Sequence, residues 1–251
     1  MSTREPESPA PGGALLAIDT STLAAGLALY RDGGVLAELQ WPAGRAQTSA
    51  LLAEIERLLT LAGLAVGELR AVATATGPGS FNGLRVGMSA AKGLAFALGV
   101  PLVGIPTLDA AAYPHAGAGR PIRAVLSAGR GRFVSALYRW QDGATVRVGD
   151  YANTTLEGLA ALIVEPTLVC GEVGAGEARR LAELVPIAQV VSPALGLRRA
   201  ACLAELAWGR LRRGESDDVD RLEPIYLHGP AGGSSDAAME VTRPAEPLAV
   251  E

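Results

Sequence analysis

The sequence carries no excess of positive charge. Its 22 lysine and arginine residues are outnumbered by 26 aspartate and glutamate residues, which gives a formal net charge of -4. Proteins that bind RNA through its phosphates present clustered basic residues, because each neutralised phosphate adds to the affinity. We therefore expect no binding of RNA by this chain alone, and any contact with RNA would need a partner protein.

Cysteine is scarce, and a long apolar run is missing. Cys170 and Cys202 have no second Cys or His at the spacing of a metal site, so both are expected to be reduced thiols in the core. The longest uncharged apolar stretch, 93–108, contains two prolines and is too short to cross a bilayer. Residues 1–13 hold acidic residues and prolines where a secretory signal would be basic and then apolar. These features predict a cytoplasmic protein without a metal site and without a membrane segment.

The hydrophobic content of 49% in 251 residues is enough for a large core, and the pattern along the chain repeats. Strands are expected up to Asp19 and on both sides of the turn at 31–34, then over 70–76 and 102–105, with helices over 45–62 and about 82–98. A second series of hairpin, helices and strands follows and closes with a helix over 194–213. The pattern predicts a duplicated α/β architecture with two lobes. The expected parts are a disordered tail over 1–13, an N-terminal lobe over 14–106, a C-terminal lobe with the closing helix over 107–228, and a disordered tail over 229–251.

A glycine-rich loop, "GPGSFNGLRVG" at 77–87, lies between a predicted strand and a predicted helix. It does not match a Walker A loop, since Gly83 is followed by leucine and arginine, and its glycine spacing misses the dinucleotide fingerprint by one residue. The residues around Ser80 do not form a nucleophile elbow either. Two interpretations remain open. The backbone N–H groups and Arg85 could hold an anion, or Ser80 or Asn82 could cap the helix while the glycines permit the turn.

The first predicted strand ends in Asp19, followed by Thr20 and Ser21. Actin-like and sugar-kinase-like ATPases carry a metal-organising carboxylate and a phosphate-binding turn at this place. The alternative is a polar turn that starts the hairpin, which is at least as well supported because "DTST" lacks the glycine of a phosphate-binding turn. The matching place in the second half holds Ser127 instead of a second aspartate, so a site for metal-assisted phosphoryl transfer lacks carboxylates.

The predicted helix over 82–98 carries small residues at every fourth position, namely Gly83, Gly87, Ala91 and Ala95. Such a stripe allows another helix to approach closely. The helix over 45–62 also has more leucine and alanine than one sheet face requires. These apolar faces indicate either additional core packing or a surface for a partner.

Several segments together resemble the TsaB family: "LLAIDTST", "GPGSFNGLRVG" followed by "AKGLA", "GVPLVGIPTLDA", "SAGRGRFVSALY" and "LEPIYLHG". The resemblance extends over roughly residues 14–228. TsaB proteins are companion subunits of the bacterial tRNA threonylcarbamoyladenosine transferase. The resemblance implies a two-lobed actin-like ATPase (ASKHA) fold in reduced form, with mixed sheets and flanking helices.

The resemblance also implies a non-catalytic role. The chain would bind and activate TsaD, which with TsaE and ATP transfers a threonylcarbamoyl group to the adenosine next to the anticodon of tRNAs reading ANN codons. It would contact tRNA only through the complex, hold no cofactor, and form a homodimer when alone. The alternative is a stand-alone actin-like ATPase or small-molecule kinase, which tight magnesium-dependent ATP binding with turnover would favour.

The family's pairing surface is formed by the two helices of the N-terminal lobe, here 45–62 and 82–98. The expected interface residues are Leu51, Leu52, Ile55, Leu58, Leu59, Gly83, Leu84, Gly87, Met88 and Ala91. The residues expected as a vestigial nucleotide or anion contact are Asp19, Thr20, Gly79, Ser80 and Arg85. The chain departs from the family at Gln47, Asn82 and Ser127, where members often have His, Thr and Asp.

Overall fold

The computed structural model describes residues 13–42 and 47–227 of the protein. The chain divides into two compact units, of which unit 1 contains the residues up to Ala110 and the segment Arg198–Ile225, and unit 2 contains Ala111–Leu197 and the residues from Tyr226. The predicted tails over 1–13 and 229–251 lie outside the described residues, except for Gly13.

Unit 1 is built on a five-stranded mixed sheet in the order β3-β2-β1-β4-β5. Its strands are β1 (Ala14–Asp19), β2 (Ala24–Arg31), β3 (Gly34–Pro42), β4 (Leu69–Gly77) and β5 (Leu102–Pro106). The first three strands form an antiparallel meander, whereas β1, β4 and β5 run parallel to one another. Strand β1 is buried at every residue, as expected for a parallel strand covered on both faces.

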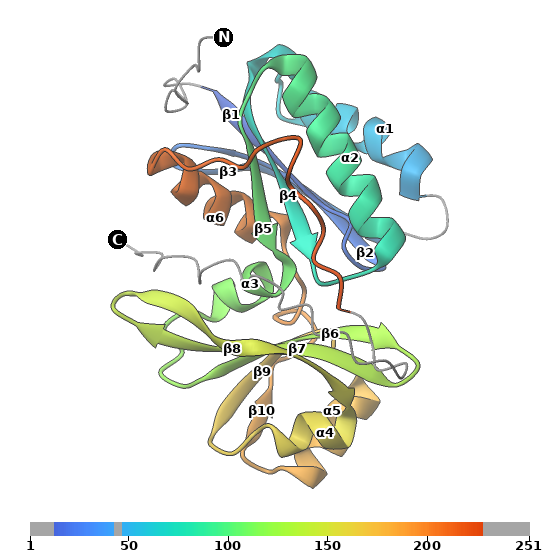
Figure 1. Ribbon diagram of the computed structural model, residues 1–251, viewed down its shortest axis with the longest axis vertical. Helices are drawn as coiled ribbons and strands as arrows, with labels where there is room; N and C mark the ends of the chain where they lie inside the picture. Colours follow the sequence, from blue (N-terminus) through green and yellow to red (C-terminus); the bar gives the residue numbers. More distant parts are fainter. Residues whose placement is uncertain (1–12, 43–46, 228–251) are drawn as a thin grey trace. The chain divides into compact units, whose positions relative to one another are not determined.

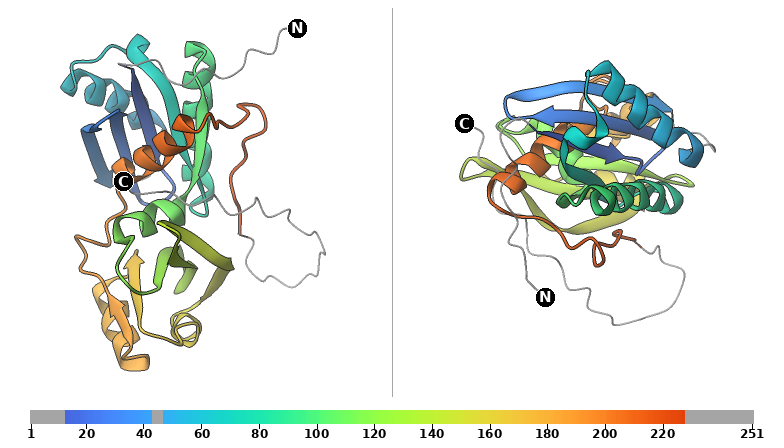
Figure 2. Two further views of the ribbon diagram at one scale, coloured as in Figure 1. Left: turned by 90° about the vertical axis from the view of Figure 1, so that its left-hand side faces the viewer. Right: turned by 90° about the horizontal axis from the view of Figure 1, so that it is seen from above.

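Helices cover both faces of this sheet (Figures 1 and 2). One face carries α1 (Gln47–Leu61) and α2 (Phe81–Leu98), and the other carries α6 (Ala200–Arg212). Local sequence sets the ends of α2: Ser80 caps its first turn, and Gly99 ends it in the left-handed conformation with a φ of 64°. A short 3-10 helix, η1 (Val66–Glu68), precedes β4.

The closing helix belongs to unit 1, whereas the expected C-terminal lobe over 107–228 included it. The second apolar face of the sheet needs a cover, and the buried side of α6, from Ala200 to Leu211, supplies it. The helix begins only at Ala200, not at residue 194. The segment after it then runs along the edge strand β5, where the Asp217 N–H donates to Leu102 O at 2.8 Å and the Gly104 N–H donates to Asp217 Oδ2 at 2.7 Å.

Unit 2 repeats the plan of unit 1 with the sheet order β10-β9-β6-β7-β8. Its strands are β6 (Ile122–Gly129), β7 (Arg132–Gln141), β8 (Ala144–Thr155), β9 (Thr167–Gly171) and β10 (Ala188–Val190). An antiparallel meander is again followed by two parallel strands, which confirms the predicted duplication. Helices α4 (Leu156–Ala161) and α5 (Ala175–Leu184) pack on this sheet, while α3 (Thr107–Ala112) and the 3-10 helix η2 (Tyr113–His115) connect the two sheets in sequence. Within the described residues, none of the helices has the length and apolarity that a bilayer crossing requires.

Candidate functional site

The turn after β1 is closed by its own aspartate. The Ser21 N–H donates to Asp19 Oδ1 at 2.9 Å, and the Ser21 hydroxyl donates to the same oxygen at 2.6 Å. Asp19, Thr20, Ser21 and Thr22 are all buried. The polar turn, one of the two interpretations of this segment, is therefore present, and its residues are buried.

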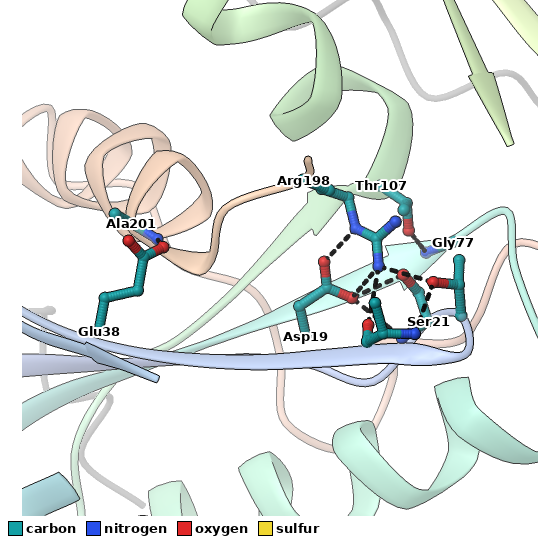
Figure 3. Close-up of polar contacts among 9 residues, drawn as sticks. Asp19, Ser21, Glu38, Gly77, Thr107, Arg198 and Ala201 are labelled. Carbon is teal, nitrogen blue, oxygen red and sulfur yellow. Dashed lines mark hydrogen bonds and ion pairs between the residues drawn. The ribbon is translucent and has the colours of Figure 1, made fainter. Parts of the chain in front are cut away.

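The charge of Asp19 is balanced by Arg198, from the segment that leads into α6 (Figure 3). Arg198 Nε donates to Asp19 Oδ2 at 2.5 Å, and Nη2 lies 3.5 Å from Oδ1. The same Nη2 donates to Thr22 Oγ1 at 3.0 Å and to Ala24 O at 3.2 Å. The two side chains of the ion pair are 3% and 4% exposed, so the pair is shielded from water. The sequence does not point to Arg198, because 179 residues separate it from Asp19 and no local pattern connects them.

The glycine-rich loop lies on this turn. A Cβ on Gly79 would be 2.2 Å from Ser21 O, a Cβ on Gly83 would be 2.1 Å from Thr20 O, and one on Gly87 would be 2.3 Å from Thr20 Oγ1. The Ser80 N–H donates to Ser21 O at 2.6 Å, and the Thr20 hydroxyl donates to Gly83 O at 2.7 Å. These glycines are therefore required for the close approach of α2 to the β1–β2 turn.

The capping interpretation of the loop is confirmed. Ser80 Oγ accepts a hydrogen bond from the Gly83 N–H at 3.3 Å and so caps α2. Arg85 is exposed, and its guanidinium carbon lies 3.8 Å from the centre of the Phe81 ring. Of the five residues predicted as a vestigial anion contact, the structure brings Asp19, Thr20, Gly79 and Ser80 together by internal contacts, while Arg85 lies on the outer surface of α2.

The predicted interface residues are mostly inside unit 1. Nine of the ten are buried, namely Leu51, Ile55, Leu58, Leu59, Gly83, Leu84, Gly87, Met88 and Ala91. The small-residue stripe of α2 thus faces the sheet and the β1–β2 turn, because that turn approaches the helix too closely for larger side chains. Leu52 is the exposed member, with 63% of its surface accessible. An interface role for the set stays a prediction, and its accessible part is Leu52.

The matching place in unit 2 is exposed, and protein groups hold its strand end and hairpin. At the end of β6, the Ser127 N–H donates to Glu172 Oε2 at 3.2 Å. In the hairpin that follows, Arg132 donates from Nε to Asn153 Oδ1 at 2.9 Å and from Nη2 to Asn153 O at 2.6 Å. Of the positions that differ from the TsaB pattern, Asn82 is an exposed residue of α2, and Ser127 lies at a strand end that Glu172 holds. The side chain of Gln47 lies outside the described residues.

Two thiols and one guanidinium lie in the core. Cys170 and Cys202 are free and buried, as predicted, and burial raises the pKa of their thiols to about 12 and about 11. In unit 2, Arg123 is 7% exposed, and burial lowers the pKa of its guanidinium. Its Nη1 lies 3.5 Å from Ser135 Oγ and its Nη2 donates to Leu162 O at 3.3 Å.

Two curated proteins are similar to parts of the chain. The tRNA threonylcarbamoyladenosine biosynthesis protein TsaB of Escherichia coli (strain K12) is 39% identical over 94 residues, which cover 38% of this chain and 40% of that protein. The protein of the same name from Bacillus subtilis (strain 168) is 29% identical over 160 residues, covering 62% of this chain and 70% of that protein. The chain thus spans 40% of the length of the first of these relatives.

Solved structures show the same fold. YeaZ from Pseudomonas aeruginosa superimposes with a TM-score of 0.70 at 29% identity, over 86% of this chain and 100% of that one. The ethanolamine utilization protein EutJ from Carboxydothermus hydrogenoformans shares the fold alone, with a TM-score of 0.50 at 15% identity over 80% of this chain and 91% of that one. Together with the two mixed sheets and their helices, these likenesses confirm the expected actin-like ATPase fold.

The family model described as TsaD, tRNA N6-adenosine threonylcarbamoyltransferase, matches residues 26–168. The matched segment is more than half of the 251 residues. This chain therefore belongs to that family, and its similarity to the TsaB and YeaZ proteins makes it a member of the TsaB group.

Proposed function

We propose that this chain is the non-catalytic partner subunit that binds TsaD and activates it in the biosynthesis of tRNA threonylcarbamoyladenosine. TsaD, together with TsaE and ATP, would transfer the threonylcarbamoyl group to the adenosine beside the anticodon of tRNAs that read ANN codons. The chain would meet tRNA only within this complex. The proposal is supported by the similarity to two TsaB proteins that are named for this biosynthesis.

The observation that carries the non-catalytic role is the ion pair between Asp19 and Arg198. A phosphoryl-transfer enzyme needs free carboxylates at its site to hold the metal that neutralises the phosphates. Here the carboxylate at the end of β1 has a guanidinium 2.5 Å away, and only 4% of its side chain is exposed. The carboxylate is therefore committed to holding the fold.

The solvent-exposed part of α1 and α2 is the proposed pairing surface, and it includes the large apolar side chains that these helices expose. The two helices lie side by side on one face of the sheet (Figure 1). Their exposed large apolar residues are Leu52, Leu61, Phe81 and Phe96, which are 63%, 73%, 51% and 82% accessible. Exposed apolar residues on neighbouring elements are typical of a surface that a partner covers.

Binding to TsaD tests this surface through two substitutions of equal exposure. Phe96 on α2 and Val164 in unit 2 are both 82% exposed, and Val164 lies outside the proposed surface. Phe96→Asp should raise the dissociation constant for TsaD by a factor of ten or more, because it places a charge against an apolar partner surface. A factor of ten corresponds to a loss of about 1.4 kcal/mol of binding free energy. Val164→Asp should leave binding unchanged. Equal effects of the two variants in a calorimetric titration would exclude the assigned surface.

Activity is tested by reconstitution. With threonylcarbamoyl-AMP as donor, TsaD, TsaE and ATP should transfer the threonylcarbamoyl group to unmodified tRNA, with release of AMP, only when this chain is added, and the chain alone should transfer none. Transfer at an equal rate without the chain would refute the proposal. ATP turnover by the isolated chain would favour the stand-alone ATPase or kinase instead.

In the absence of TsaD, we propose that two copies of the chain associate through the same surface. Water disfavours exposed apolar side chains, and a second copy would cover those that α1 and α2 present. Sedimentation velocity should show a dimer for the natural sequence and a monomer for Phe96→Asp. A monomeric natural chain would contradict this part of the proposal.

A further inference from the structure

The actin-like ATPase fold implies a magnesium nucleotide at the ends of the first strands, so the residues at that place can be tested for their fit to such a group. In unit 1 they do not fit. Asp19 accepts hydrogen bonds from the Ser21 N–H and hydroxyl at 2.9 and 2.6 Å and from Arg198 Nε at 2.5 Å. A carboxylate has about four acceptor positions, and protein donors take at least three of them.

The charge of Arg198 disfavours a metal ion beside Asp19 even more than the occupied acceptor positions of the carboxylate do. An arginine side chain stays protonated in proteins, so Arg198 is a permanent positive charge beside the Asp19 carboxylate. Both side chains are almost completely buried, where screening by water and salt is weak. A metal ion next to Asp19 would therefore meet a buried like charge.

The glycine loop is likewise held by protein groups. The Ser80 N–H donates to Ser21 O at 2.6 Å. The volume that the missing side chains of Gly79 and Gly83 leave is filled by the carbonyl oxygens of Ser21 and Thr20, at 2.2 and 2.1 Å from the positions of a Cβ. In unit 2, the Ser127 N–H is likewise taken by Glu172 Oε2.

We propose that Arg198 is a built-in substitute for the metal ion at the end of β1. Its guanidinium neutralises Asp19 and fixes Thr22 and Ala24, so that the β1–β2 turn is closed without a ligand. The closed turn then positions α2, because Thr20 and Ser21 form hydrogen bonds with the residues at the start of that helix. Unit 1 thus excludes a magnesium nucleotide from this place and uses the Asp19 carboxylate to position α2.

Chemical rescue tests whether this place is a cation site filled by an arginine. Arg198→Ala removes the guanidinium, and millimolar methylguanidinium should restore most of the lost melting temperature, because the small cation can occupy the same position beside Asp19. The double variant Asp19→Asn/Arg198→Ala should show no such restoration. Arg199→Ala is the matched control, since the neighbouring Arg199 pairs with Glu38 and is 54% exposed. A folded Arg198→Ala that gains no more from methylguanidinium than Arg199→Ala would overturn the proposal.

Hydrogen exchange in the same variants tests whether the β1–β2 turn positions α2. The amides of Ser21 and Ser80 should exchange at least ten times faster in Arg198→Ala than in the natural chain, and methylguanidinium should slow them again. In Arg199→Ala both amides should exchange at the natural rate. Unchanged exchange in Arg198→Ala would mean that the ion pair does not hold the turn, and the positioning role would be refuted.

A third measurement needs no variant that could fail to fold. The natural chain is titrated calorimetrically with MgCl₂ alone and with Mg-ATP, and no saturable heat is expected from either. Saturable binding of either one to the natural chain would overturn the proposal. These experiments use the isolated chain and do not depend on TsaD, so their failure is distinct from a failure of the pairing function.

Discussion

Substitution of Gly83 by alanine tests the contact between the glycine-rich loop and the β1–β2 turn. Alanine normally stabilises a helix interior by about 0.5–1 kcal/mol relative to glycine. At Gly83, however, the new Cβ would lie 2.1 Å from Thr20 O, a backbone atom that cannot rotate away. Either α2 or the turn must therefore move.

The structure sets the size of the expected loss. Moving α2 away from the turn weakens the hydrogen bond from the Thr20 hydroxyl to Gly83 O at 2.7 Å and the bond from the Ser80 N–H to Ser21 O at 2.6 Å. Each is worth about 1 kcal/mol, and the overpacking strain adds about 1–3 kcal/mol. After the gain in helix propensity is subtracted, we expect Gly83→Ala to destabilise unit 1 by about 2–4 kcal/mol.

Gly93→Ala is the matched control, because it is the same change in the same helix with no neighbouring atom within 4 Å of the new Cβ. It should stabilise α2 by up to about 1 kcal/mol. Hydrogen exchange of buried amides in α2 measures the opening free energy of unit 1 without assuming that the whole chain unfolds in one step. If Gly83→Ala stabilised α2 as much as Gly93→Ala does, the loop would not be held by the turn and the reasoning would be wrong.

Three further predictions concern charge and burial. Burial raises the pKa of the Cys170 thiol from 9.0 to about 12, so its thiolate fraction at neutral pH falls about 1,000-fold; a thiol reagent should label neither Cys170 nor Cys202 in the folded chain and both after unfolding in urea. The hydrogen bond from Arg213 lowers the pKa of Glu215 below its ordinary 4.5, so the stability from this carboxylate is complete above that pH and is lost as the pH falls through the lowered pKa; Glu215→Gln should flatten the acid limb of a melting-temperature profile below pH 4.5. Arg123→Met should change the urea-unfolding free energy of unit 2 by no more than about 1 kcal/mol, since the loss of weak hydrogen bonds is offset by relief of a buried charge, and a loss of more than about 3 kcal/mol would contradict this balance.

Local features of the molecule were predictable because they depend on residues close in sequence. The alternation of strand and helix patterns and the repeat of hairpin and parallel strands correspond to the observed sheets. The cap at Ser80 and the end of α2 at Gly99 follow from backbone requirements that a few neighbouring residues meet. The polar turn at Asp19 belongs to the same class, since its hydrogen bonds span two residues.

The partners of the apolar faces were less predictable. Helical spacing shows that α1 and α2 each have an apolar side, but the same spacing is produced by a helix that packs on its own sheet and by one that packs on another protein. The sheet of unit 1 takes most of these side chains, including Leu51, Ile55 and Met88, and leaves Leu52 and Phe96 outside. The sheet that α6 covers is equally unpredictable from its sequence, since the apolar side of this helix could pack on the sheet of either unit.

The sequence by itself determined the elements, their order, their duplication and the family, because each depends on short patterns or on motifs that stand together in the chain. Only the tertiary structure decided what the Asp19 carboxylate and the loop glycines do. Their partners, Arg198 and the backbone oxygens of Thr20 and Ser21, come from segments far apart along the chain. A carboxylate that must be neutralised can accept a metal or an arginine, and only the folded chain shows that the arginine is already there.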